Sequence, residues 1–167
     1  LRSLVGSEMG IRDSLNASVG DNELVVHHYI DVGIAVDLEY QGLLVPVVRS
    51  ADTKRIRAIA REVNDLATRA KTRKLSPDEI SGGTFTITNL GAFGVETLIG
   101  IINPPQAAIL GVGSIMPAAV VKNGEIVIRS MMKVALSADH RVSDGAAGPR
   151  FIQEIQGLLA TTASLAL

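Results

Sequence analysis

Short apolar runs separated by turn residues dominate the first part of the chain. Strands are predicted at residues 24–30, 31–36, 43–48, 84–89 and 107–112. Pro46 cannot donate a ladder hydrogen bond, which places its strand at a sheet edge or a bulge. Asn123-Gly124 lies between apolar arms at residues 120–122 and 125–128, and this dipeptide predicts a tight hairpin.

Helical periodicity is clear in two places. The first stripe of apolar positions consists of Ile56, Ile59, Ala60, Val63, Leu66, Ala67 and Ala70. Asp52 or Thr53 is expected to cap this helix, and its basic opposite face indicates a solvated surface. The second stripe consists of Phe151, Ile152, Ile155, Leu158 and Leu159. Residues 1–15 have only a weak helical pattern without a start signal.

The composition argues against two classes of protein, membrane-spanning proteins and general nucleic-acid binders. The 167 residues suit one domain, and 47% of them are hydrophobic, with a mean hydropathy of +0.30. The chain has no run of 18 apolar residues, so we expect buried subunit contacts and no membrane span. A net charge of -1 argues against general nucleic-acid binding.

No metal site is expected. The chain has no cysteine, which excludes disulfides, thiolate metal ligands and a cysteine nucleophile, and which fits a reducing compartment. His27 and His28 are neighbours on a predicted strand, so their side chains point to opposite faces and cannot easily share a metal ion. Both histidines are expected to have structural or surface roles.

One polar corner near the C-terminus carries candidate chemistry. The apolar run of residues 131–136 leads into the chain's one His-x-x-x-Asp-Gly, formed by His140, Asp144 and Gly145. A histidine with a pKa of about 6.5 can accept and return a proton near neutral pH. Asp144 can hold a local turn or an arginine, and Gly145 permits a sharp turn. The alternative is a histidine satisfied by a neighbouring carboxylate in a strand-to-helix corner.

A family resemblance adds to this interpretation. Residues 139–145, Asp-His-Arg-Val-Ser-Asp-Gly, resemble the Asp-His-Arg-x-x-Asp-Gly motif of the dihydrolipoamide acyltransferases. These enzymes form the catalytic cores of 2-oxo acid dehydrogenase complexes and share a fold with chloramphenicol acetyltransferase. Residues 16–18, 33–36, 42–47, 83–91 and 101–110 also resemble the family, in the family's order. The chain is therefore identified as a member, and residues 101–110 are most similar to the pyruvate-type enzymes.

The resemblance implies a fold and an assembly. The expected fold is an α/β two-layer sandwich with a mixed β-sheet, of the chloramphenicol acetyltransferase type. Residues 1–167 are expected to form a single acyltransferase core domain that lacks part of the family's N-terminal region. A homotrimer is expected, which can be built into a larger cage of trimers. In this fold the active site lies between subunits, with His140 from one subunit and Thr88 from the next.

The resemblance also implies residue roles. His140 is expected to be the general base, and the Thr88 hydroxyl to bind the oxyanion of a tetrahedral intermediate. Asp144 is expected to be a structural carboxylate that orients the corner through an arginine. Arg141, Gly145 and Asn89 are expected to support the motif. Because Thr88 lies on a predicted strand, an ordinary strand hydroxyl is the alternative for that residue.

The implied reaction is acyl transfer between a dihydrolipoyl thioester and coenzyme A, with acetyl as the expected group. Coenzyme A would be a substrate, and the lipoyl group would be carried on a domain outside this chain. Expected partners are that lipoyl domain and the other subunits of a 2-oxo acid dehydrogenase complex, with no nucleic acid and no membrane. The expected location is the bacterial cytoplasm, with the mitochondrial matrix as the alternative.

Two other functions are alternatives to catalysis. A non-catalytic core subunit would keep the fold, but His140, Asp144 and a hydroxyl at position 88 argue against it, while the unusual N-terminal region argues for it. A nucleic-acid module built on Gly91-x-x-Gly94 conflicts with the charge balance and the absence of an aromatic platform. The basic helix face has alternatives too: it could meet an acidic partner domain or coenzyme A phosphates.

Three features depart from the family or extend beyond the motif. Ala138 stands where many members have an aromatic residue. Pro149 lies inside the predicted C-terminal helix, so that helix is expected to begin late or to be distorted. The apolar residues 163–167 are expected to dock on a neighbouring trimer and join trimers into a cage.

Overall fold

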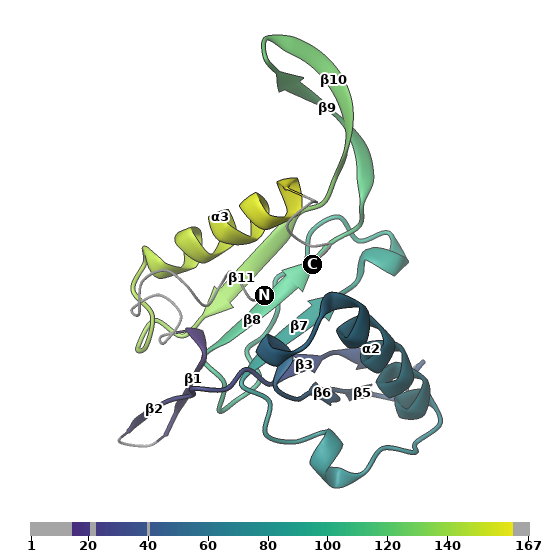
Figure 1. The fold of residues 1–167 in the computed structure, drawn as a ribbon, viewed down its shortest axis with the longest axis vertical. Helices are drawn as coiled ribbons and strands as arrows, with labels where there is room; N and C mark the ends of the chain where they lie inside the picture. The colour runs from purple at the N-terminus through teal and green to yellow at the C-terminus, as the bar shows by residue number, and fades with distance from the viewer. Residues whose placement is uncertain (1–14, 21–22, 40, 162–167) are drawn as a thin grey trace.

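The computed structural model describes residues 15–20, 23–39 and 41–161. Within them, five strands form a central sheet in the order β11-β8-β7-β3-β6. These strands are β3 (Val32–Ile34), β6 (Val47–Val48), β7 (Phe85–Asn89), β8 (Ala108–Val112) and β11 (Val134–Ala138). Neighbours among β3, β7 and β8 pair in parallel, whereas β6 and β11 pair antiparallel at the two edges. The predicted mixed sheet is therefore confirmed (Figure 1).

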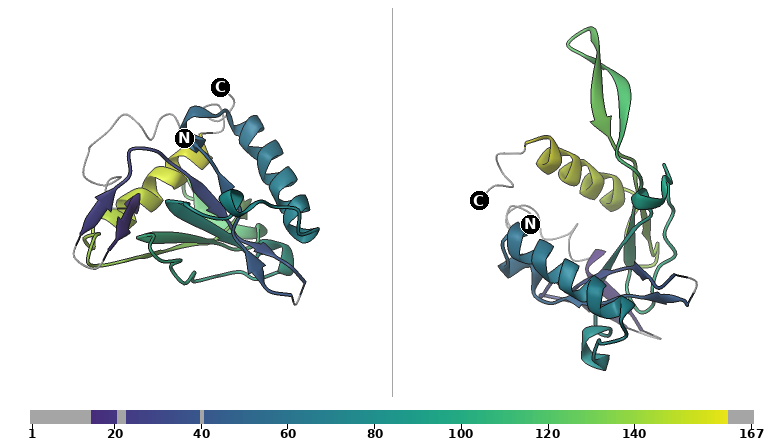
Figure 2. Two further views of the ribbon diagram at one scale, coloured as in Figure 1. Left: turned by 90° about the horizontal axis from the view of Figure 1, so that it is seen from below. Right: turned by 90° about the vertical axis from the view of Figure 1, so that its right-hand side faces the viewer.

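The helices α2 (Ile56–Lys71) and α3 (Ala147–Ala160) lie on the same face of the sheet, which confirms the two-layer sandwich (Figure 2). Phe85 of β7 packs against Phe151 of α3, with ring centroids 5.8 Å apart. Leu66 of α2 packs in a cluster with Val48 of β6. Leu66 is almost fully buried, so its side chain contributes roughly 1.5 to 3 kcal/mol to folding, whereas Ile56 and Leu159 at the helix ends are 49% and 45% exposed and contribute less.

Smaller elements complete the described chain. They are β1 (Ala17–Val19), β2 (Leu24–Val26), β4 (Val36–Asp37), β5 (Leu43–Leu44), β9 (Met116–Lys122), β10 (Glu125–Met131) and 3-10 turns at Ala51–Thr53, Pro77–Glu79 and Gly91–Phe93. Pro46 separates β5 from β6, so the strand predicted at residues 43–48 is two short strands. The prediction of a sheet edge is confirmed, because β6 is an edge strand.

The start of α2 differs from the prediction. Asp52 and Thr53 were expected to cap the helix, but both lie in the preceding 3-10 turn, and the N-cap residue Arg55 makes no side-chain cap. The C-terminal helix was expected to begin late or to be distorted at Pro149, but α3 begins at Ala147, directly after the motif, and Pro149 lies in its first turn, where proline needs no N–H partner. The weak helix predicted at residues 1–15 lies almost entirely outside the described residues.

The β9–β10 hairpin projects away from the rest of the molecule (Figure 1). Its turn has left-handed backbone at Asn123 and Gly124, with φ of 54° and 84°, as the Asn-Gly dipeptide predicted. Val121, Ile126 and Ile128 are 74%, 78% and 79% exposed. Val121 and Ile126 lie opposite each other in the ladder, so these apolar side chains share one face of the hairpin. An exposed apolar face of this kind is typical of a protein–protein contact.

An ion pair between the buried Asp31 and the half-exposed Arg49 anchors the loop that enters β7. Asp31, almost fully buried, accepts a hydrogen bond of 2.7 Å from Arg49 Nη1 and another from the Ser50 amide. The same guanidinium donates to the carbonyls of Asp78 and Ser81 at 2.6 Å each. Because one side chain satisfies several carbonyls of this loop, it fixes the start of the strand that carries the Thr88 hydroxyl.

Candidate active site at the end of strand β11

The predicted histidine corner lies directly after β11. The Asp139 amide still donates to the Ala107 carbonyl at 2.8 Å, and the chain then turns so that the amides of Val142 and Ser143 donate back to the Asp139 carbonyl. Residues 139–143 therefore form a compact turn. His140 is exposed at this turn, where its ring can meet a substrate or a second protein surface.

Asp139 and Arg141 hold the turn together. The Asp139 carboxylate accepts hydrogen bonds from the Arg141 amide at 2.9 Å and from its guanidinium at 2.6 Å. These bonds hold the pKa of Asp139 at about 2, because they favour the ionised carboxylate. Arg141 was expected to support the motif, and it contacts this turn. The role of Asp139 was not predicted, although an aspartate two residues before an arginine in a turn is a usable signal.

Asp144 starts the helix that follows the motif. Its Oδ1 atom accepts hydrogen bonds from the Ala146 and Ala147 amides at 3.0 and 2.8 Å. It thereby satisfies amide groups that a helix N-terminus leaves without intrahelical partners. Among the ion pairs of the described residues none involves Asp144, so the arginine expected to hold it stays a prediction.

Gly145 does not play the part expected from its flexibility. It is not among the described glycines with left-handed backbone, and a Cβ atom built there would meet nothing within 4 Å. Neither the backbone conformation nor the space at this position requires glycine, and the supporting role expected of Gly145 stays a prediction. The turn instead follows from the hydrogen bonds of Asp144, which fix the backbone as it enters α3.

An open depression of about 520 Å³ lies beside the histidine. Its lining comes from β11, from the turn and from the first two turns of α3, and includes Leu136, Ala138, His140, Asp144 and Ile152. Leu136, Ala138 and Ile152 bring apolar side chains to the lining, while His140 and Asp144 bring polar groups to it. An apolar depression with few polar groups is typical of a site that binds a small organic group. The small side chain of Ala138 is among its lining residues.

Thr88 lies far from His140 within one chain. Thr88 pairs with Gly111 of β8, and Gly111 pairs with Ala135 of β11, so Thr88 and Ala135 are level across the sheet. Two strand spacings separate them, roughly 10 Å, and β11 runs on for three more residues, roughly a further 10 Å, before the turn that contains His140. A single chain therefore does not bring the two predicted catalytic residues together.

A hydrogen-bonded 3-10 turn follows β7 and fixes the backbone directly after Thr88. Asn89 Oδ1 accepts a hydrogen bond of 2.7 Å from the Gly91 amide, which starts the 3-10 turn. Ser114 Oγ donates to the Gly91 carbonyl at 2.9 Å. A Cβ atom at Gly91 would lie 2.8 Å from the Gly113 carbonyl oxygen, so this close approach of two backbone segments requires glycine. Asn89 thus fixes the backbone turn that follows Thr88, and its role in supporting a catalytic site stays a prediction.

His27 has a structural contact away from the site. Its Nε2 atom lies 2.7 Å from Ser18 Oγ, and its ring packs against Tyr29 with centroids 5.2 Å apart. His28 is exposed. The prediction that both histidines have structural or surface roles is confirmed by these contacts and exposures.

Asp144→Ala is expected to lower the free energy of unfolding by about 0.5 to 2 kcal/mol, because the first amides of α3 lose their acceptor. Urea denaturation followed by circular dichroism measures the change. Asp144→Asn keeps an oxygen at Oδ1 and should retain most of the stability. If the asparagine and alanine variants are equally destabilised, the stabilisation comes from the negative charge near the helix N-terminus and not from the cap.

Comparison with known proteins agrees with this geometry. The sequence model of the 2-oxoacid dehydrogenases acyltransferase (catalytic domain) family matches residues 12–167. The chain belongs to this family. It is 46% identical over 137 residues to the dihydrolipoyllysine-residue acetyltransferase component of the pyruvate dehydrogenase complex from Rickettsia felis. It is 44% identical over 154 residues to the succinyltransferase component of the 2-oxoglutarate dehydrogenase complex from Rickettsia typhi.

These alignments cover 82% and 92% of this acyltransferase-family chain but 33% and 38% of the relatives. The chain thus spans about a third of the length of the curated relatives it matches. Among solved structures, it resembles dihydrolipoamide acetyltransferase from Azotobacter vinelandii, with a TM-score of 0.87 and 37% identity. It resembles the cubic core of the pyruvate dehydrogenase multienzyme complex equally well, with a TM-score of 0.87 and 36% identity. Each match covers 95% of this chain and 66% of the solved chain.

The fold prediction is confirmed by these structures, which are acyltransferase cores. The described part of the chain contains no helix with both the length and the apolar character needed to cross a membrane. The apolar tail at residues 163–167, predicted to dock on a neighbouring trimer, lies outside the described residues.

Proposed function

We propose that this chain is the catalytic core of an acyltransferase that moves an acyl group between a dihydrolipoyl thioester and coenzyme A. The observation that carries the proposal is the pair of side chains that one fold presents: an exposed histidine after the end of β11 and a hydroxyl near the end of β7. Acetyl is the proposed group. Relatives named for acetyl and for succinyl transfer both match, and the residues 101–110 favour the pyruvate type.

The spacing of the three proposed residues supports this function. The catalytic mechanism of the Azotobacter vinelandii enzyme has been studied through a serine, a histidine and an asparagine. The serine and histidine lie 52 positions apart and the asparagine four further on. Thr88, His140 and Asp144 have the same separations. Threonine keeps the serine hydroxyl, and aspartate keeps one oxygen acceptor of asparagine.

In the proposed mechanism, His140 carries one proton from the sulfur of coenzyme A to the sulfur of the dihydrolipoyl group. A ring nitrogen of His140 takes the proton of the coenzyme A thiol, and the sulfur attacks the carbonyl carbon of the acyl-dihydrolipoyl thioester. The Thr88 hydroxyl donates a hydrogen bond to the resulting oxyanion. The intermediate then breaks its bond to the dihydrolipoyl sulfur, and that thiolate recovers the proton from His140. Asp144 acts on this chemistry as a positioning residue, through the start of α3.

The separation of Thr88 from His140 favours an active site shared between two copies of the chain. We propose a homotrimer, in which three copies related by threefold symmetry would form three such sites. The projecting β9–β10 hairpin supports assembly, because its Val121, Ile126 and Ile128 side chains are unpartnered in one chain. Burying three aliphatic side chains would supply roughly 5 to 9 kcal/mol per contact before ordering costs.

A mixing experiment tests the shared site. Subunits carrying His140→Ala are unfolded and refolded together with subunits carrying Thr88→Val in equal amounts. In a trimer with shared sites, about a quarter of the sites receive both intact residues, so activity should return to about a quarter of the wild-type value. Each variant refolded alone is the control and should stay near its own low rate. Recovery no greater than the mean of the two variants would place both residues in one chain and reject the shared site.

The proposed partners follow from the same reaction. A lipoyl domain would deliver the acyl group, and other subunits of a 2-oxo acid dehydrogenase complex would surround the core. Trimers are proposed to form a larger cage, since a structure that the chain resembles is a cubic core. The bacterial cytoplasm is the proposed location, because the relatives described above are bacterial proteins. A non-catalytic core subunit remains the second candidate, and the activity assays decide between them.

A further inference from the structure

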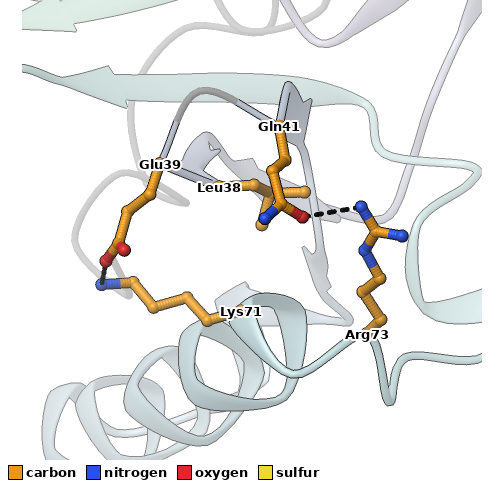
Figure 3. Close-up of a pocket in the computed structure, with 5 residues that line it drawn as sticks. All are labelled: Leu38, Glu39, Gln41, Lys71 and Arg73. Atoms are coloured by element: carbon orange, nitrogen blue, oxygen red, sulfur yellow. Dashed lines mark hydrogen bonds and ion pairs between the residues drawn. The ribbon is translucent and has the colours of Figure 1, made fainter.

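A second cavity lies at the far side of the molecule from the histidine corner. Its volume is about 140 Å³, and its lining residues are Leu38, Glu39, Gln41, Lys71 and Arg73. The first three belong to the turn between β4 and β5, while Lys71 and Arg73 come from the C-terminal end of α2. Figure 3 shows the two cationic side chains reaching from the helix end toward Glu39 and Gln41 across the gap.

Arg73 occupies a backbone conformation that favours glycine. Its φ is +55°, and it follows the C-cap residue Thr72 of α2. The Arg73 amide donates to the Ala70 carbonyl and the Lys74 amide donates to the Arg69 carbonyl, which is the hydrogen-bond pattern of a Schellman motif. Glycine is the usual residue at this left-handed position because a Cβ atom is strained there. An arginine at this position therefore costs stability.

Glu39, on the opposite side of the cavity, is also left-handed, with φ of +52°. Two of the four described residues other than glycine with positive φ thus line one small cavity. Strained backbone of this kind is concentrated at ligand clamps and other functional sites. The coincidence indicates that the side chains at these two positions are retained for something other than the stability of the turn.

The polar groups of the cavity are mainly donors. Arg73 Nη2 donates to Gln41 Oε1 at 2.8 Å, which uses one of five guanidinium hydrogens. Lys71 Nζ lies 3.9 Å from Glu39 Oε1, and the Glu39 side chain is 79% exposed. An exposed pair at this distance contributes little, so an incoming anion can displace Glu39 at little cost. Two cations would then face the ligand together with the Gln41 amide.

We propose that this cavity binds the phosphate group of a small molecule, with Arg73 and Lys71 as its ligands. A guanidinium fork matches two phosphate oxygens, and an ammonium group adds a compact positive charge. The position of the cavity allows it to bind a phosphate group of a substrate as well as free phosphate. Ile34 pairs with Ile87 in parallel register, so the turn that follows β4 leaves the sheet at the same end as Thr88. Only identification of the ligand as coenzyme A rests on the proposed acyl transfer.

The decisive variant is Arg73→Gly, because a structural role and a binding role predict opposite results. Glycine relieves the left-handed strain, so the midpoint of thermal unfolding should stay or rise, while affinity for inorganic phosphate should fall at least tenfold. Titration calorimetry of the full chain with inorganic phosphate measures the affinity. Lys71→Met, which leaves the backbone alone, should weaken phosphate binding as well.

Asn123→Gly is the matched control, since it relieves a left-handed residue of similar φ, +54°, in the β9–β10 turn. It should leave phosphate affinity unchanged. Wild-type protein that binds no phosphate, or Arg73→Gly protein that binds it as well as wild type, would overturn the proposal. So would a lower unfolding midpoint in Arg73→Gly without any loss of phosphate affinity, because Arg73 would then be purely structural.

Two further titrations separate the sources of the phosphate. Coenzyme A carries phosphates, whereas pantetheine carries the same thiol arm without them. If the cavity serves coenzyme A, Arg73→Gly should weaken coenzyme A binding about tenfold, leave pantetheine binding unchanged, and raise KM for coenzyme A with kcat unchanged. If coenzyme A affinity is unchanged while phosphate affinity falls, the site is a separate phosphate site. The phosphate titrations decide the proposal even in a chain without transferase activity.

Discussion

His140→Ala is expected to lower the rate of acyl transfer to coenzyme A by about 10² to 10⁴, because the reaction loses its general base. His140 is exposed, and its side chain makes no hydrogen bond within the described residues, so folding and assembly should survive the change. Transfer from an acetyl-dihydrolipoamide donor, measured with the oligomer size for wild type and variant, checks both parts of the expectation.

His28→Ala provides the matched control, since it removes a second exposed imidazole outside the corner. Its rate should equal that of the wild type. Equal rates for His140→Ala and wild type would remove His140 from the mechanism. If the wild type and His140→Ala are both inactive while the oligomer is intact, the non-catalytic core subunit is favoured, because catalysis is then absent before any substitution.

Thr88→Val is expected to lower kcat by about 10² to 10³ with little change in KM, because valine keeps the branched shape and removes only the oxyanion donor. Thr88 is half-buried at the end of β7, where a methyl group can replace the hydroxyl without a large change in packing. Steady-state kinetics over a range of coenzyme A concentrations separates the two constants.

Thr88→Ser restores a hydroxyl without the methyl group and should keep most of the activity. It is the informative control, because the alternative is an ordinary strand threonine. If valine and serine at this position both leave kcat unchanged, Thr88 is such a threonine and the oxyanion donor lies elsewhere. If KM rises and kcat does not fall, Thr88 contributes to binding and not to the transition state.

Periodicity predicted the helices well and the strands less well. The apolar stripes around Leu66 and Phe151 persist over several turns, and each helix buries the face that its stripe indicates. The strands around Pro46 are only two residues long, so pattern alone could not separate them. The cap of α2 was misplaced because Asp52 and Thr53 are good capping residues that the chain uses in a 3-10 turn instead.

The site was predictable where local chemistry determines it. Asp144 lies only two and three residues before the amides it accepts from, so its contact with the start of α3 is a local event. The distance between Thr88 and His140 depends on strand order, which no local pattern contains, and only the family resemblance placed them in one site. Coenzyme A phosphates were an alternative partner of the basic helix face, to which Lys71 and Arg73 belong, but the cavity that these two residues share with Glu39 and Gln41 was not predicted. Its signal is an arginine two positions after a helix end, where glycine is common.

The β9–β10 hairpin has a consequence for how the protein is made. In the proposed trimer, a newly synthesised chain would expose Val121, Ile126 and Ile128 to water until another copy covered them. During that interval any other unfolded or partly folded chain can bind the exposed side chains instead. Such aggregation increases when chains are synthesised faster than they associate with one another. The interval is shorter when chains are released near one another, for example from ribosomes on one messenger RNA. If the trimer forms as proposed, we expect the yield in a heterologous host to depend on the rate of encounter between subunits more than on the stability of the individual sandwich.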